Sequence, residues 1–143
     1  MVGEREIQRE TKINYNFLQR LIPSMRKSGT KRLLYQAGGF SKPHDAELSF
    51  IIWALRKTIA RSFEGQHQDN DAVGAYLAKD CMDIEWINHR AGIGGDGSSK
   101  GTLQRAVGAM NPSIGTHRDC ADYSYAVVLD DSAIHTSSFS RYK

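Results

Sequence analysis

The sequence predicts an α+β fold: a predominantly helical single domain over residues 1–143, with four or five helices and a C-terminal β-hairpin. Three observations lead to this prediction. The chain has 143 residues, the size of one ordinary domain. Apolar residues recur at helical spacing over most of the chain up to Pro112. After Pro112 the pattern changes to two short runs rich in aromatic and β-branched residues, YSYAVVL and AIHTSSF.

The clearest helix is predicted over residues 41–65, where six apolar residues between Leu48 and Phe63 repeat at helical spacing. Ser41 is placed to cap its first turn, Pro43 suits that turn, and Gly65 can close the last turn. This helix is expected to be central because its apolar surface is wider than one stripe.

Four further segments complete the helical part of the prediction. Residues 69–89 and 98–111 are predicted helices because their apolar residues repeat every three or four positions. Residues 14–26 have the same spacing, although Pro23 is expected to kink or divide that helix. Residues 30–36 are predicted to form one further short helix before two glycines.

The C-terminal hairpin is predicted from residues 123–129 and 133–139, joined across Asp130, Asp131 and Ser132. An isolated hairpin is marginally stable in water. The two strands are therefore expected to lie against the helices or to pair with another strand edge.

Composition narrows the class of protein. Hydrophobic residues make up 40% and charged residues 24% of the chain, ordinary values for a globular domain. The longest apolar run, residues 50–55, is too short to cross a bilayer, and the N-terminal residues lack the pattern of a signal peptide. Cys81 and Cys120 lack metal-type spacing, so we expect reduced thiols and neither a metal nor a cofactor. A soluble, cytoplasmic protein without a membrane partner is expected.

Charge divides the chain into two halves. Residues 1–61 carry a net charge of +7 and residues 62–143 a net charge of −4. Residues 11–44 contain seven basic residues and no acidic one. Such a cluster favours a counter-charge: a phosphate, an acidic partner, or the acidic half of the same chain or of a second copy. Because the two halves have opposite charge, one copy of the chain could also bind another, so a homo-oligomer is a further expectation.

The function predicted first is a non-enzymatic binding protein whose basic N-terminal half engages nucleic acid or another polyanion. Basic residues interleaved with aromatic ones suit single-stranded nucleic acid, because cations contact phosphates and rings stack on bases. The residues predicted to carry this binding are Arg20, Arg26, Lys27, Lys31 and Arg32. An alternative is a protein-interaction module, an inhibitor or assembly factor, in which the same half docks on an acidic protein.

A glycine-rich loop, GIGGDG at residues 92–97, matches the pattern of dinucleotide-binding loops. That fingerprint requires a preceding strand, whereas the sequence predicts a helix there and no second parallel strand. A helix predicted to begin at Ser98 or Ser99 would still offer backbone N–H groups to an anion. The candidate anion site consists of Gly94, Gly95, Gly97, Ser98, Ser99 and Lys100.

An enzymatic alternative rests on Arg61 and His67, in RSFEGQH. Their spacing resembles that of the HEPN ribonucleases, which implies that Arg61 holds a phosphate and His67 assists proton transfer without a metal. Gly65 is expected to interrupt the helix between them, and Ser62 occupies the position of the expected polar residue.

A magnesium site is a weaker enzymatic alternative. Asp80 and Asp83 could join Glu47 around the ion, as in helical nucleotide pyrophosphohydrolases, but the doubled glutamates expected on the first helix are missing. Acidic residues on an amphipathic helix are more often simply solvated. The sequence therefore favours a binding protein over an enzyme.

Overall fold

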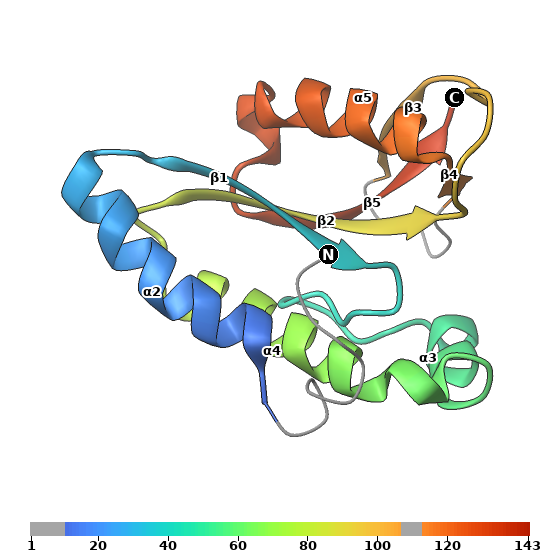
Figure 1. Ribbon diagram of the computed structural model, residues 1–143, viewed down its shortest axis with the longest axis horizontal. Helices are drawn as coiled ribbons and strands as arrows, with labels where there is room; N and C mark the ends of the chain where they lie inside the picture. Colours follow the sequence, from blue (N-terminus) through green and yellow to red (C-terminus); the bar gives the residue numbers. More distant parts are fainter. Residues whose placement is uncertain (1–10, 107–112) are drawn as a thin grey trace. The chain divides into compact units, whose positions relative to one another are not determined.

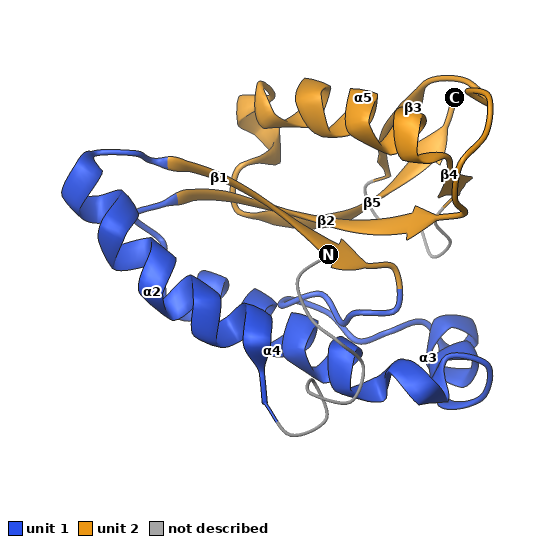
Figure 2. Ribbon diagram, in the orientation of Figure 1, with its two compact units in different colours: residues 1–31, 40–84 blue, residues 32–39, 85–143 orange. Residues whose placement is uncertain are grey.

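The computed structural model describes residues 11–106 and 113–143. The chain divides into two compact units: unit 1 is formed by residues 1–31 and 40–84, and unit 2 by residues 32–39 and 85–143 (Figure 2). Within the described residues, the regular structure of unit 1 is helical and every strand lies in unit 2 (Figure 1). That the chain forms one domain remains a prediction.

The first helix of unit 1, α2 (Ile13–Ser28), confirms the helix predicted over residues 14–26. Pro23 lies inside it without dividing it. Leu18, Ile22 and Met25 form its buried stripe. The helix ends at Gly29, whose φ of 74° lies in the left-handed region that favours glycine, and whose N–H donates to the carbonyl of Arg26.

Unit 1 continues with α3 (Phe50–Lys57), the 3₁₀ turn η1 (Arg61–Phe63) and α4 (Glu64–Asp80). The single helix predicted over residues 41–65 is therefore wrong outside residues 50–57 and the start of α4. Ser49 caps α3, its Oγ accepting the Ile52 N–H at 3.4 Å, whereas the sequence predicts Ser41 as the cap. The segment before Ser49 is held differently, because the Lys42 N–H donates to Asp71 of α4 at 2.6 Å.

The helix predicted over residues 69–89 is correct only in its first half. α4 ends at Asp80, and β2 (Glu85–Ile93) begins four residues after Cys81. The side chains of β2 are buried almost continuously, from Trp86 to Ala91. A strand that is buried on both faces does not alternate apolar and polar residues. The apolar residues of β2 therefore continue the helical spacing of α4, and the sequence pattern does not mark where the helix ends.

Unit 2 holds a mixed sheet of five strands within the described residues. They are β1 (Arg32–Gly38), β2, β3 (Leu103–Ala106), β4 (Ile114–Gly115) and β5 (Thr136–Tyr142). β2 pairs in parallel with β1, β4 and β5, and β5 pairs antiparallel with β3. The order β1-β2-β5-β3, with β4 beside β2, is visible in Figure 1.

These strands overturn the predicted fold class. The described residues form a mixed α/β structure of four α-helices and a five-stranded sheet, instead of a predominantly helical domain with a C-terminal hairpin. Residues 30–36, predicted as a helix, include most of β1, whose partner β2 lies some fifty residues away in the chain. The predicted helix over residues 98–111 contains β3, and its last residues, 107–111, lie outside the described residues.

The hairpin is also wrong in its first strand. Residues 123–129 belong to α5 (His117–Val128) and its end, and only residues 136–139 of the second predicted strand lie in β5. Thr116 starts α5 by accepting the Asp119 N–H on its Oγ1 at 3.1 Å. Tyr123 and Val127, four residues apart, lie on one face of the helix and join a core cluster with Ile87, Leu103, Cys120 and Ala133.

A short 3₁₀ turn, η2 (Asp131–Ala133), links α5 to β5. No helix among the described residues combines the length and the apolar character needed to cross a membrane.

Candidate functional site

The basic residues predicted to bind a polyanion begin on α2. Arg20, Ser24 and Lys27 follow one another at helical spacing on the side of α2 away from its buried stripe, and all are exposed. Phe17 lies at the edge of the same side and is 56% exposed. Lys31 is exposed in the segment between α2 and β1. Within the described residues, no ion pair joins Arg20, Lys27 or Lys31 to an acidic side chain.

Arg26 is bound within unit 1. Its Nε and Nη2 donate to the two carboxylate oxygens of Asp83 at 2.7 and 2.6 Å, and Nη2 also donates to the Asp80 carbonyl. The hydrogen bonds to Asp83 raise the pKa of Arg26, and those from Arg26 lower the pKa of Asp83. Arg26 therefore fastens the end of α2 to the turn after α4.

Arg32 is likewise engaged, in this case inside unit 2. Its guanidinium donates to Glu85 at 2.9 Å, to Asp131 at 2.8 Å and to the Val128 carbonyl at 3.1 Å. These bonds tie the start of β1 to the start of β2 and to the end of α5. Two of the five predicted binding residues thus find their counter-charges in the acidic half of the chain, an option that the charge division had already raised.

The carboxylates considered for magnesium do not form a metal cluster. Asp83 is committed to Arg26, and Glu47 forms an ion pair of 2.5 Å with Lys42. No group of three or more histidine, cysteine or acidic residues that could hold a metal ion exists within residues 11–106 and 113–143.

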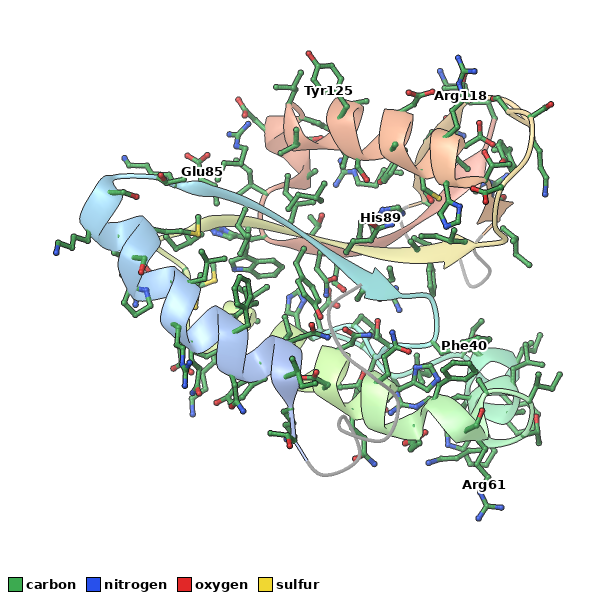
Figure 3. All side chains as sticks on the ribbon, in the orientation of Figure 1. Phe40, Arg61, Glu85, His89, Arg118 and Tyr125 are labelled. Carbon is green, nitrogen blue, oxygen red and sulfur yellow. The ribbon has the colours of Figure 1, made fainter. Side chains whose placement is uncertain are left out.

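Arg61 and His67 lie in different environments. Arg61 is exposed on η1, and its side chain points away from the rest of unit 1 (Figure 3). His67 is 5% exposed and both of its ring nitrogens are buried. Its ring lies edge-to-face with the Phe40 ring, with the two centroids 5.6 Å apart. Burial lowers the pKa of His67, so the folded protein holds it neutral and away from solvent. A phosphate on Arg61 would not meet an accessible imidazole.

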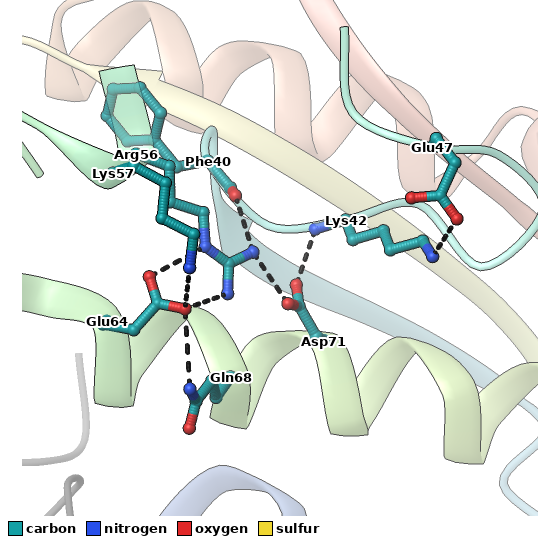
Figure 4. Close-up of polar contacts among 8 residues, drawn as sticks. All are labelled: Phe40, Lys42, Glu47, Arg56, Lys57, Glu64, Gln68 and Asp71. Carbon is teal, nitrogen blue, oxygen red and sulfur yellow. Dashed lines mark hydrogen bonds and ion pairs between the residues drawn. The ribbon is translucent and has the colours of Figure 1, made fainter. Parts of the chain in front are cut away.

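A polar network surrounds Arg56 (Figure 4), whose positive charge also lowers the pKa of His67. The Arg56 guanidinium, whose side chain is 7% exposed, donates to both oxygens of Glu64 at 3.1 Å, to Asp71 at 2.7 Å and to the Phe40 carbonyl at 3.3 Å. Burial alone would raise the pKa of Glu64, but the hydrogen bonds and charge of Arg56 outweigh it and lower that pKa. Each of the three guanidinium nitrogens of Arg56 donates at least one hydrogen bond, which suits a structural clamp between α3 and α4.

The glycine-rich loop directly follows a strand, contrary to the prediction. It leaves the end of β2, beside the parallel strands β1 and β4. The Gly94 N–H donates to the Gly115 carbonyl at 2.9 Å, and the His117 N–H at the start of α5 donates to the Gly95 carbonyl at 3.1 Å. No helix starts at Ser98 or Ser99; residues 98–102 carry no regular structure and lead into β3.

A carboxylate of the chain itself occupies the candidate anion site. Asp119 accepts hydrogen bonds from the Ser99 hydroxyl, from the Lys100 N–H at 3.1 Å and from the Tyr142 hydroxyl at 2.5 Å. The bonds from Ser99 and Tyr142 are the main reason that the pKa of Asp119 lies far below its ordinary value. An external anion at Ser99 and Lys100 would have to displace Asp119.

Two features escaped the sequence analysis. The first is α3, where Phe50, Ile51 and Trp53 are exposed although the sequence predicts a central helix there. The second is a buried polar group in unit 2. His89 is 1% exposed, and its Nε2 forms a hydrogen bond with the Ser140 hydroxyl at 2.9 Å. Its ring packs on the Tyr123 ring, with the two centroids 4.5 Å apart. The sequence offered no signal for the second feature, because Glu85, Asn88 and Arg90 near His89 are polar as well.

Comparisons of the chain with protein-family models, with curated proteins and with solved structures found no match in any of the three. The roles of its residues are inferred from their own contacts, burial and charge.

Proposed function

We propose that the chain is a binding protein whose basic N-terminal half engages nucleic acid or another polyanion through α2 and the segment that follows it. The observation that carries this proposal is the set of Arg20, Lys27 and Lys31, three exposed cations without a described acidic partner. The exposed ring of Phe17 lies one helical turn before Arg20. Cations of this kind release counterions when they contact phosphates, and an exposed ring stacks on an unpaired base.

The proposal excludes Arg26 and Arg32 from the binding surface. Both guanidinium groups already bond carboxylates of the acidic half. Of the five residues predicted to bind, Arg20, Lys27 and Lys31 then remain, and contacts by these three alone predict modest affinity and a shallow dependence on salt. Each phosphate contact contributes about one unit to the slope of log K against log salt concentration, so a slope of roughly three is expected.

The test is a fluorescence-anisotropy titration of labelled single- and double-stranded RNA and DNA at two salt concentrations, with EDTA present. Binding should weaken as salt rises, and Lys27→Glu or Lys31→Glu should weaken it by about tenfold or more. Arg118→Glu is the matched control, because Arg118 is an exposed arginine of unit 2 and makes the same charge change (Figure 3). If all three variants lose the same affinity, the loss reflects the net charge of the protein and not a particular surface, and the proposed surface is rejected.

The same samples, run on a gel, test the alternatives from the sequence. Cleaved RNA in the presence of EDTA would favour a metal-independent ribonuclease and contradict a pure binding role. If the chain binds no nucleic acid but captures an acidic protein in a salt-sensitive way, the same cations would instead bind that protein, and the chain would be a protein-interaction module.

A second candidate function is the binding of a small phosphate-bearing ligand at the glycine-rich loop. One observation favours it: the loop leaves the carboxyl end of β2 beside a parallel strand, the edge at which open α/β sheets bind their ligands. Asp119 opposes it, because its carboxylate already takes the hydrogen bonds of Ser99 and Lys100. A thermal-shift titration with inorganic phosphate and a nucleoside triphosphate tests it. Stabilisation that Lys100→Ala removes and Lys79→Ala retains would support it, and no shift at millimolar ligand would reject it.

A further inference from the structure

His117 and Asp96 form a hydrogen-bonded pair at the start of α5. The Nδ1 atom of His117 lies 3.0 Å from the Oδ1 atom of Asp96. A carboxylate only accepts hydrogen bonds, so Nδ1 carries the hydrogen in this contact. In a neutral ring the other nitrogen, Nε2, then has no hydrogen and keeps its lone pair. The pair therefore leaves His117 with a nucleophilic Nε2 atom.

The backbone brings these two side chains together. The Gly94 N–H donates to the Gly115 carbonyl at 2.9 Å, and the His117 N–H donates to the Gly95 carbonyl at 3.1 Å. Both bonds join the glycine-rich loop to the start of α5, directly before Asp96. Gly95 has a φ of 103°, in the left-handed region that favours glycine. The glycine-rich loop thus positions Asp96 beside the His117 ring.

His117 is also the histidine that solvent reaches most easily. Its side chain is 59% exposed, whereas that of His44 is 21% exposed. Of the other three histidines, His67 and His89 are buried and His135 is half-buried. All five histidines of the chain lie within the described residues. A small reagent in solution should therefore meet the His117 ring first.

The start of α5 places positive charge next to this ring. His117 is the first residue of a helix of twelve residues, so the positive end of the helix dipole lies beside it. Arg118 follows directly, is exposed, and forms no ion pair with a described acidic residue (Figure 3). A phosphoryl group carries up to two negative charges, and this surrounding favours such a group.

We propose that His117 is a phosphoryl acceptor, which takes the phosphoryl group on Nε2 from a phosphoramidate, a donor that holds phosphorus on nitrogen. The Nε2 lone pair attacks the phosphorus atom, and the P–N bond of the donor breaks. The donor nitrogen already carries its proton, so it leaves as a neutral amine. One P–N bond replaces another, and the His117 ring becomes positively charged.

Asp96 is the positioning residue of this reaction. Its carboxylate holds the hydrogen on Nδ1, which keeps Nε2 free to attack, and its negative charge offsets the positive charge that the ring acquires. It contacts the ring at Nδ1, so it leaves the Nε2 edge open to the donor. This site lies in unit 2 and the α2 surface in unit 1, so the phosphoryl acceptor and the proposed polyanion binding can fail separately.

The first test is the position of the hydrogen on the His117 ring, measured by ¹⁵N NMR of the full chain at a pH where the ring is neutral. In the wild-type chain the hydrogen should lie on Nδ1. Asp96→Ala should move it towards Nε2, the position that free histidine prefers. Asp122→Ala, which removes an exposed carboxylate from the same helix, is the matched control and should change nothing. A hydrogen on Nε2 in the wild-type chain would overturn the proposal.

The second test is the reaction itself. The full chain is incubated with millimolar phosphoramidate, and the product is followed by mass spectrometry and ³¹P NMR, which distinguishes phosphorus on Nε2 from phosphorus on Nδ1. The first phosphoryl group should appear on Nε2 of His117 and be absent from His117→Ala. Asp96→Ala should slow this step by about tenfold, because the ring loses the carboxylate that fixes its hydrogen, while Asp122→Ala should react at the wild-type rate.

Three results would reject the proposal: reaction at Nδ1, equal rates at His44 and His117, or an unchanged rate in Asp96→Ala. Circular dichroism checks that each variant keeps the wild-type fold. In the anisotropy titration, His117→Ala should bind nucleic acid as the wild-type chain does, which separates this site from the α2 surface.

Discussion

Asp69 caps α2 from the middle of α4: its Oδ2 accepts the Asn14 N–H at 2.8 Å and its Oδ1 accepts the Tyr15 N–H at 3.0 Å. These two N–H groups have no partner within their own helix, because they lie in its first turn. Lys12, the residue at the cap position, provides no side-chain hydrogen bond. A buried carboxylate 55 positions further along the chain thus replaces a local cap, and its negative charge suits the positive end of the helix dipole.

The first prediction concerns this cap. Asp69→Ala should lower the free energy of unfolding by about 2 kcal/mol, since two N–H groups lose their acceptors. Asp69→Asn keeps one acceptor oxygen and should lose about half as much. Urea denaturation measures both variants, and hydrogen exchange should accelerate at Asn14 and Tyr15. A loss no larger than that of a typical surface substitution, ~0.5 kcal/mol, would contradict the capping role.

The second prediction concerns the Arg56 network. Arg56→Met should cost about 3 kcal/mol in unfolding free energy, because Glu64 and Asp71 would remain charged and partly buried without their partner. Arg56→Lys should recover only part of this loss, since an ammonium group cannot bond both oxygens of Glu64 and the oxygen of Asp71 in the same plane. Urea denaturation measures both variants. Equal stability of the lysine variant and the wild type would show that charge alone matters.

The third prediction follows from exposure. Arg26 and Asp83 form a two-point ion pair like that of Arg56 and Glu64, but their side chains are 41% and 54% exposed. Water and salt screen such a pair, so Asp83→Asn should lower the Tm by only about 2 °C or less. The effect should shrink further at high salt, which thermal unfolding at two ionic strengths will check. A loss as large as that of Arg56→Met would mean that exposure does not govern these pairs.

The fourth prediction concerns pH and His89. Burial lowers the pKa of His89 from 6.5 to about 4. The unfolded chain therefore binds a proton near pH 6.5 while the folded chain does not, so stability falls as the pH drops from 6.5 and levels off below about 4. The loss should reach about 3 kcal/mol over this window. His89→Gln removes the titration, and the difference between the two denaturation profiles isolates it; parallel profiles would contradict the prediction.

The fifth prediction concerns Asp119 and the loop it holds. Asp119→Asn should speed hydrogen exchange of the Lys100 amide about tenfold, because a charged acceptor is replaced by a neutral one. Because the pKa of Asp119 is lowered from 3.8, the wild-type protection is complete above about pH 4 and is lost only as the pH falls through the lower, folded-state value. Asp122→Asn, on the exposed side of α5, should leave this exchange unchanged.

Local patterns predicted the elements whose structure depends on neighbours in the chain. The buried stripe Leu18, Ile22 and Met25 predicted α2, and Gly29 ends it through its left-handed backbone. Residues 50–57 and most of α4 were also recognised as helical, because residues three or four apart lie on the same face of a helix. The uneven charge of the two halves also led to the correct prediction that acidic residues of the second half can bind basic residues of the first.

The strands were missed because their partners are distant. β1 and β2 pair Arg32 with Glu85, and neither segment alternates in a way that separates a buried strand from a helix. In α5, Tyr123, Val127 and Val128 have side chains that favour strands, yet packing on the core overrides that preference. Thr116 followed by Asp119 was a local signal for the start of α5.

By itself, the sequence determined where charge accumulates, that residues 14–26 are helical, and which segments are apolar. Only the tertiary structure decided that Arg26 and Arg32 are held by Asp83, Glu85 and Asp131, that Asp119 fills the proposed anion site, and that Phe50 and Trp53 face outward. The physical reason is the same in each case. An apolar run or a charged group has a preferred environment, but which residue supplies that environment depends on contacts between segments far apart in the chain.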